Sequence, residues 1–286
     1  MGLARSVAFQ LAMSERFESV VGAVPGGRRL AYSRARRYVA GQTLDEARDV
    51  ARRLLDLGLA VSLDAFGELV TDPGAAVAAA GSYAELIDVA AALGGDVWVS
   101  VDLSHIGLDV STDFCRAQLA RIAERLPPGM RLQVGAEDAA RCDAILDIVE
   151  DAAARGAALT CTLQANLRRS MDDVARVASL GIPVRLVKGA FVEPAGVAHP
   201  YGPDTDLRYV ELHVALRERG AEVLTATHDT ALRELLEPRQ VEMLLGVHER
   251  KAVDLAGRGT PVRIYAPYGA MWFRYFMRRV AEAQGS

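Results

Sequence analysis

The segment Val-Arg-Leu-Val-Lys-Gly-Ala-Phe, residues 184–191, places two cations in an otherwise apolar stretch. Burying Arg185 and Lys188 would be costly unless each meets an anion or lies at the end of a strand. A bound phosphate or carboxylate would supply such a partner, and Gly189 would let a flat ring approach the backbone. A salt bridge to an acidic residue of a neighbouring strand explains the same cations equally well. The segment alone therefore does not distinguish a ligand site from an internal ion pair.

The C-terminal segment carries a second cationic group. Four of its residues are spaced at i, i+3, i+4 and i+7 and so share one face of a helix, namely Tyr275, Arg278, Arg279 and Glu282. Two guanidinium groups beside a phenol suit the bidentate capture of a small carboxylate, with Glu282 fixing the arginines. Taken alone, these residues favour a simpler interpretation, a solvated face with ordinary Arg–Glu pairs.

Histidine chemistry gives a weaker signal. His228 follows an apolar run in Thr-Ala-Thr-His-Asp, where it is as often a structural hydrogen-bonding group as a catalyst. The five histidines show no metal-ligand spacing, so we predict no metal site. There is also no GxSxG turn, no Walker loop and no GxGxxG after a strand, which disfavours nucleophilic hydrolysis and nucleoside-triphosphate chemistry.

Eight short apolar runs alternate with amphipathic stretches and would position these groups. The runs are Leu59–Leu63, Asp96–Val101, Met130–Val134, Ala158–Leu163, Pro183–Val187, Glu222–Ala226, Val241–Leu245 and Val262–Ala266. Strands that alternate with helices form a parallel sheet, and eight units favour a closed barrel. We therefore predict an α/β fold, a (β/α)8 TIM-type barrel with extra N-terminal helices and a C-terminal helix at the active site. In such barrels the active site lies at the carboxyl ends of the strands.

The chain organisation expected from the sequence is one structural domain, with residues 1–58 as a helical arm packed on a catalytic barrel of residues 59–286. Thr43 and Glu46 form a plausible capping box for the helix that leads into the barrel. The 33 basic and 37 acidic residues give a formal net charge of −4, which disfavours a nucleic-acid partner.

Cellular location is predicted from the cysteines and from hydrophobic runs. The three cysteines fit neither a disulfide framework nor a zinc site, and we expect small buried thiols in a reducing compartment. No run approaches the roughly 20 apolar residues of a membrane span. We expect a cytoplasmic protein whose membrane contact, through an amphipathic N-terminal helix, is at most peripheral and at the inner face of the membrane.

Taken together, the segments between about Val61 and Glu282 resemble the proline dehydrogenase family, in its FAD-dependent, monofunctional bacterial type. The similarity is carried by short motifs that stand in the family's order: Ser62-Leu-Asp-Ala-Phe-Gly-Glu68, Gln164-Ala165, Arg185-Leu-Val-Lys-Gly-Ala190, Ala226-Thr-His-Asp229, Leu245-Gly-Val247, Arg263-Ile-Tyr-Ala-Pro-Tyr-Gly269 and Tyr275-Phe-Met-Arg-Arg-Val-Ala-Glu282. The resemblance implies oxidation of L-proline to 1-pyrroline-5-carboxylate, by hydride transfer to FAD, in proline catabolism.

The resemblance also implies roles for individual residues. Arg278 and Arg279 would hold the substrate carboxylate, oriented by Glu282, and Tyr265 and Tyr275 would form the walls of the substrate pocket. The residues that would bind FAD are Gln164, Arg185, Val187, Lys188, Gly189, Ala190, Thr227 and His228. The electron acceptor stays open between a quinone, oxygen and another protein.

Four positions depart from the family pattern. Asp102 stands where the family usually has a lysine, and Gly135 stands where it has an aspartate. Phe191 replaces a tyrosine, and Asn166 replaces an aromatic residue. Asp102 and Gly135 together suggest a relocated carboxylate that pairs with Arg278 or Lys188, so Asp102 joins the candidate catalytic residues. Losing a cation there would weaken carboxylate capture by about a few kcal/mol unless another group compensates.

Two alternatives to L-proline oxidation therefore stay open. One is a flavoenzyme of the same fold that oxidises another cyclic or secondary amine, which Asp102 favours. The other is a flavin-binding protein without turnover, which the complete Arg-Arg-Glu face disfavours.

Overall fold

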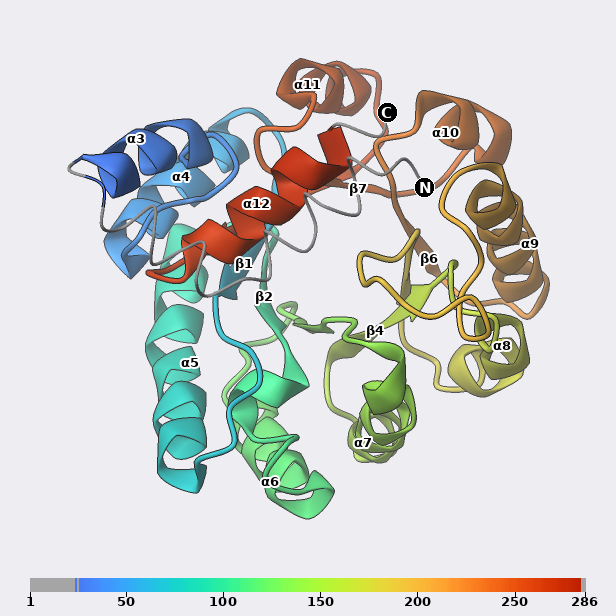
Figure 1. Ribbon diagram of the computed structural model, residues 1–286, viewed down its shortest axis with the longest axis horizontal. Helices are drawn as coiled ribbons and strands as arrows, with labels where there is room; N and C mark the ends of the chain where they lie inside the picture. The colour runs from blue at the N-terminus through green and yellow to red at the C-terminus, as the bar shows by residue number, and fades with distance from the viewer. Residues whose placement is uncertain (1–23, 25, 284–286) are drawn as a thin grey trace.

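Eight parallel strands close into a barrel in the order β1-β2-β3-β4-β5-β6-β7-β8, with helices around the outside (Figure 1). The computed structural model describes residue 24 and residues 26–283, without the side chains of residues 281–283. The strands are β1 (Ala60–Ala65), β2 (Val97–Val101), β3 (Leu132–Val134), β4 (Leu159–Gln164), β5 (Val184–Val187), β6 (Val223–Ala226), β7 (Val241–Leu244) and β8 (Val262–Tyr268). Each overlaps one of the eight predicted runs, and the predicted (β/α)8 barrel is confirmed.

The strands are apolar because both of their faces are covered. Every residue of β2 and of β4 is buried, as expected for parallel strands that lie between a packed barrel interior and a layer of helices. Pairing of β1 with β8 closes the barrel, with Ala60 beside Arg263 and Asp64 beside Pro267. This closure brings the carboxyl end of the first strand next to that of the last, 203 residues away in the chain.

Helices alternate with the strands along the chain, as the amphipathic stretches between the apolar runs predicted. They are α3 (Gly27–Ala35), α4 (Leu44–Asp56), α5 (Pro73–Leu93), α6 (Thr112–Ala123), α7 (Cys142–Ala154), α8 (Ser170–Ala178), α9 (Pro203–Glu218), α10 (Thr230–Leu236), α11 (Glu249–Gly257) and α12 (Trp272–Ala283), with short 3₁₀ turns η1 (Leu103–Ile106) and η2 (Ala139–Arg141). The capping box predicted at the start of α4 is present: Thr43 accepts from the Glu46 N–H, and the Glu46 carboxylate accepts from the Thr43 N–H.

Among the helices that the structure describes, α5 is the one whose length and composition would allow it to cross a membrane, with a mean hydropathy of 1.4. The expectation that no segment has such a composition was wrong, because alanine and glycine make α5 apolar without a long Val/Leu/Ile run. In the barrel, α5 packs against β2, α4 and α6 and buries Tyr83, Leu86 and Ile87. It is thus an outer helix of the barrel. The N-terminal segment proposed for peripheral membrane contact, residues 1–23, lies outside the described residues.

The cysteines mostly follow the prediction of small buried thiols. Cys115 and Cys161 are buried in the main core, whereas Cys142 is half-buried at the start of α7.

The last helix, α12, lies across the end of the barrel at which the strands terminate (Figure 1). It packs on α3 through a separate aromatic cluster centred on Trp272 and Phe273. The rings of Tyr32 and Trp272 are 5.0 Å apart, and those of Phe66 and Tyr275 are 5.3 Å apart. Aromatic packing therefore fixes α12 to the N-terminal helices on one side and to the end of β1 on the other.

Candidate active site

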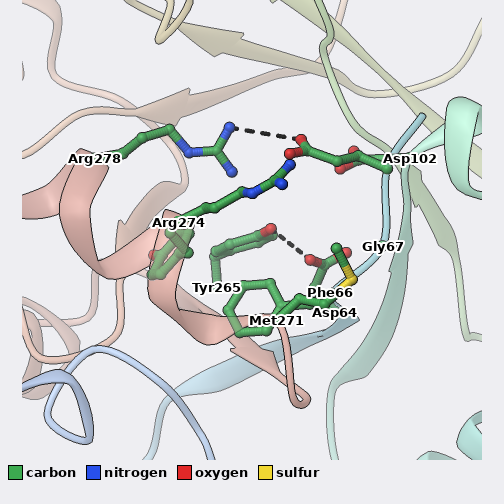
Figure 2. Close-up of a pocket in the computed structure, with 10 residues that line it drawn as sticks. Asp64, Phe66, Gly67, Asp102, Tyr265, Met271, Arg274 and Arg278 are labelled. Atoms are coloured by element: carbon green, nitrogen blue, oxygen red, sulfur yellow. Dashed lines mark hydrogen bonds and ion pairs between the residues drawn. The ribbon is translucent and has the colours of Figure 1, made fainter. Parts of the chain in front are cut away.

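A hollow whose empty space, open solvent included, is about 400 Å³ lies between α12 and the carboxyl ends of β1, β2 and β8. Its lining combines acids, arginines and aromatic rings: Asp64, Phe66, Gly67, Glu68, Asp102, Tyr265, Met271, Arg274, Tyr275 and Arg278 (Figure 2). Four residues predicted from the sequence meet there, namely Asp102, Tyr265, Tyr275 and Arg278. The concentration of polar groups at this end of the barrel is the arrangement expected for a (β/α)8 enzyme.

Tyr265 is fixed in this hollow, which we call the substrate pocket, by a hydrogen bond to the first strand. Its hydroxyl donates to Oδ2 of Asp64 over 2.7 Å, across the β1–β8 pair (Figure 2). Burial raises the pKa of the Asp64 carboxyl to about 6, although the Tyr265 hydrogen bond and the charges of Arg185 and Arg278 oppose that shift. The phenol ring of Tyr265 is thus held as a fixed wall of the pocket.

The two arginines of the predicted carboxylate-binding face have different surroundings. Arg278 enters the pocket (Figure 2), and its Nη1 lies 3.6 Å from Oε2 of Glu68. The guanidinium of Arg279 lies over the ring of Tyr275, 5.0 Å from its centroid. Its positive charge helps to lower the pKa of His228, on the β6 side of the barrel. Glu282 belongs to α12, but its side chain lies outside the described residues.

Asp102, at the end of β2, faces an unusual group of acids. Burial raises the pKa of Asp102 well above its ordinary value, and the charges of Asp64, Glu137 and Glu68 add to that rise. The charge of Arg278 acts in the opposite direction, while the ion pair that the structure gives Arg278 is with Glu68, so the pairing of Asp102 with Arg278 stays a prediction. The predicted alternative, pairing with Lys188, was wrong, because Lys188 is engaged by Asp206 at 2.6 Å and Asp229 at 3.0 Å.

The absence of a side chain at Gly135 leaves room for the Asp102 carboxyl group. A Cβ atom at Gly135 would lie 1.9 Å from Oδ1 of Asp102, so no larger residue fits there while Asp102 keeps its position. The two departures from the family pattern therefore depend on each other sterically. With Asp102 at the end of the second strand, the aspartate that the family has at position 135 cannot fit.

The raised pKa of Asp102 predicts a pH-dependent cost in stability. Because its pKa is higher in the folded than in the unfolded chain, ionisation disfavours folding, and wild-type stability falls as the pH rises above about 4 towards the folded-state pKa. We expect Asp102→Asn to remove this loss, so that its free energy of unfolding exceeds that of the wild type at pH 8 and differs little from it at pH 4. Urea unfolding across that range measures it.

The matched control for this prediction is Asp88→Asn on the outer face of α5, where the Asp88 side chain is 70% exposed. This variant should show no such trend with pH. A difference between Asp102→Asn and the wild type that stays constant from pH 4 to 8 would contradict the prediction.

The barrel interior beneath the pocket holds a buried ion pair. Nε of Arg185 on β5 lies 2.5 Å from Oε1 of Glu242 on β7, and Glu242 also accepts from Nε2 of Gln133 at 3.1 Å. Ser62 donates to the other end of the Gln133 amide. Arg185 therefore has the internal partner that the sequence left open, while its guanidinium lies 5.5 Å from the Tyr265 ring centroid, beside the substrate pocket.

Gly189, at the end of β5, lies close to the Asn166 side chain, and the approach of a flat ring to its backbone stays a prediction. Its φ of +106° lies in the left-handed region, and a Cβ there would come within 1.9 Å of the Asn166 side chain. Oδ1 of Asn166 is buried without a hydrogen-bond partner among the described residues. Ala190 is exposed and Val187 half-buried at the same strand end. Gln164, at the end of β4, is fixed by donating to the Glu137 carbonyl over 2.8 Å.

His228 has a buried N–H donor without an acceptor among the described residues. Its Nε2 accepts from the Leu244 N–H over 3.2 Å, so the neutral ring carries its proton on Nδ1, which is buried without a partner among the described residues. Burial lowers the pKa of His228 to about 3, and the charge of Arg279 adds to this, so the ring is neutral at physiological pH. Thr227 precedes it and accepts from the Asp229 N–H. Across the residues that the structure describes, no three His, Cys, Asp or Glu side chains are grouped as metal ligands.

Sequence analysis missed several residues of the pocket as site residues: Asp64, Phe66, Glu68, Met271 and Arg274. Arg274 could have been found from helical periodicity, because it precedes Arg278 by four residues and so lies on the same face. The contribution of the β1–α5 loop was harder to predict, since it depends on the pairing of β1 with β8.

Comparison with known proteins agrees with this architecture. The sequence model of the family described as "Proline dehydrogenase" matches residues 47–196. Proline dehydrogenase 1 of Bacillus subtilis subsp. natto is 31% identical over 260 residues, which cover 87% of this chain and 86% of that protein. The proline dehydrogenase of Deinococcus radiodurans is 32% identical over 268 residues, with the same two coverages.

Solved structures support the fold. Proline utilization A from Bdellovibrio bacteriovorus, inactivated by N-propargylglycine, superposes with a TM-score of 0.79 at 19% identity over 98% of this chain. The match takes up 36% of that longer protein, so the chain corresponds to about a third of it. A family match over more than half of the sequence, with relatives above 30% identity along most of it, shows that the chain belongs to the proline dehydrogenase family of enzymes.

Proposed function

We propose that this chain oxidises L-proline to 1-pyrroline-5-carboxylate in proline catabolism, with FAD as the hydride acceptor. The observation that carries the proposal is the substrate pocket, in which Arg278 faces Asp102 and the Asp64–Tyr265 pair at the carboxyl ends of the strands (Figure 2). We further propose that residues 1–58 form a helical arm and residues 59–286 the catalytic barrel. We also propose that the enzyme acts in the cytoplasm.

Membership of the family indicates a flavin, and the ends of β4, β5 and β6 fit one. Nδ1 of His228 can donate to a ligand and Oδ1 of Asn166 can accept from one, and both are buried without a partner among the described residues. Gly189 has no side chain at the end of β5, and the Asn166 side chain lies against it there. We propose that FAD is held by the predicted set of Gln164, Arg185, Val187, Gly189, Ala190, Thr227 and His228. Lys188 would support that set through its ion pairs with Asp206 and Asp229.

When bound, the flavin supplies the two-electron redox chemistry, and the protein supplies binding, orientation and exclusion of water. Arg278 would bind the proline carboxylate through charge-assisted hydrogen bonds, with Arg279 adding positive charge from the β6 side. Tyr265, fixed by Asp64, and Tyr275 would press the five-membered ring into one orientation. The secondary amine must be neutral for oxidation, and a dry pocket favours that form because desolvation disfavours the ammonium ion.

An anaerobic titration tests the proposal. The purified protein should show a flavin absorption spectrum that bleaches when L-proline is added and returns when a soluble quinone is supplied as acceptor. Bleaching by pyrrolidine or another cyclic amine, but not by proline, would favour the alternative substrate that Asp102 suggests. A bound flavin that no amine bleaches would indicate a flavin-binding protein without turnover.

A further inference from the structure

Arg274 is a charged residue of the substrate pocket that lies outside every motif quoted from the sequence. It is the third residue of α12, is half-buried, and lines the pocket one helical turn before Arg278. Figure 2 shows the Arg274 and Arg278 side chains entering the pocket side by side, with both guanidinium groups directed towards the end of β2, where Asp102 lies. Arg274 and Arg278 thus form a pair on one wall of the pocket.

This arrangement is unfavourable for a helix considered alone. Like charges at i and i+4 repel each other, and a cation in the first turn opposes the helix dipole, which favours acids at that end. The first turn of α12 contains no acidic residue to relieve either effect. Long arginine side chains on a surface helix can separate into solvent, yet Arg274 and Arg278 converge. Convergence at this cost is expected where the two groups share an anionic partner.

Asp64 and Glu68 on the pocket wall leave room for such a partner. Asp64 accepts the Tyr265 hydroxyl, and the ion pair between Glu68 and Arg278 is long, at 3.6 Å. Both Arg278 and Glu68 keep some exposure, at 16% and 19% of their side chains. A substrate carboxylate can therefore approach Arg278 from the pocket without first breaking a short, fully buried ion pair, and Arg274 lines the same wall one helical turn away.

We infer that Arg274 binds the substrate carboxylate together with Arg278 and so determines specificity for an amino acid over a simple cyclic amine. Because Asp102 places an acid at the end of β2, the cation that holds the carboxylate from this side comes instead from the first turn of α12. The inference rests on the proposed function, in that proline is taken as the substrate.

The test compares Arg274→Met with Arg274→Lys, and with Arg219→Met as a control at the exposed end of α9. Three quantities are measured: the KM for L-proline, the inhibition constant of pyrrolidine, and the Kd of cyclopentanecarboxylate by calorimetry. For Arg274→Met we expect the proline KM and the cyclopentanecarboxylate Kd to rise about tenfold, with kcat and the pyrrolidine constant within twofold of wild type. Arg274→Lys should lose less, and Arg219→Met should match the wild type.

The result that would overturn the inference is an Arg274→Met variant whose cyclopentanecarboxylate Kd stays within twofold of wild type. Equal weakening of proline and pyrrolidine would also overturn it, because that pattern indicates a change of pocket shape. As a further arm, Arg274→Met combined with Asp102→Lys should recover most of the lost affinity by supplying the cation from β2. If the wild type fails to oxidise proline, the proposed function fails, while calorimetry with cyclopentanecarboxylate still decides the role of Arg274.

Discussion

Replacing Arg278 by methionine is expected to raise the KM for L-proline about a hundredfold while leaving the flavin bound. Charge-assisted hydrogen bonds contribute about 1.5–3 kcal/mol each, so removing one strong carboxylate contact corresponds to about two orders of magnitude in affinity. Methionine keeps much of the length and apolar stem of arginine, so the packing of α12 should survive. Steady-state kinetics give KM and kcat, and the absorbance ratio of flavin to protein gives the cofactor content.

Two further variants show whether the effect belongs to the pocket. Glu68→Gln removes the acid 3.6 Å from Arg278 and should lower the proline KM, because the arginine no longer has an internal competitor for the substrate. Arg121→Met, on the outer helix α6, should leave both constants unchanged. An Arg278→Met enzyme with a wild-type KM would remove Arg278 from substrate binding, whatever its flavin content.

The barrel was predictable because its strands and helices follow from patterns among residues that are close in the sequence. Strands buried on both faces must be apolar throughout, and all eight were visible as runs such as Pro183–Val187, which contains β5. The capping box at Thr43 is likewise a contact between residues three apart. Predictions of this kind need no knowledge of which strand lies beside which.

The site was only partly predictable because its contacts join distant strands. The sequence could not decide between a ligand and an internal acid for Arg185, since the answer lies on β7, 57 residues later. Helical spacing placed Arg278 and Arg279 on one face, but adjacent residues diverge by about 100° around a helix of 3.6 residues per turn. In the structure Arg278 accordingly reaches Glu68, while Arg279 lies over Tyr275 towards His228. Asp102 and Gly135 were recognised as related departures, but their steric dependence required coordinates.

The Arg185–Glu242 pair should give the largest change in stability in this protein. Glu242→Leu would leave Arg185, whose side chain is 12% exposed, without its ionic partner in the barrel interior, and we expect a loss of about 3–5 kcal/mol in the free energy of unfolding. Arg185→Leu should cost a similar amount, because Glu242 is 1% exposed and, among the described residues, would keep the Gln133 amide as its hydrogen-bond donor without a direct ion pair. Urea unfolding of each variant measures these losses.

The double variant Arg185→Leu, Glu242→Leu separates the structural role of the pair from its role in the site. Replacing a whole buried ion pair by apolar side chains is often neutral for stability, so the double variant should be more stable than either single one. If Arg185 only balances Glu242, the double variant should also bind FAD like the wild type. We expect instead that it folds but binds FAD at least tenfold more weakly, as judged by flavin fluorescence on titration. Wild-type FAD affinity in a stably folded double variant would assign Arg185 to the barrel core alone, because its charge would then serve only Glu242.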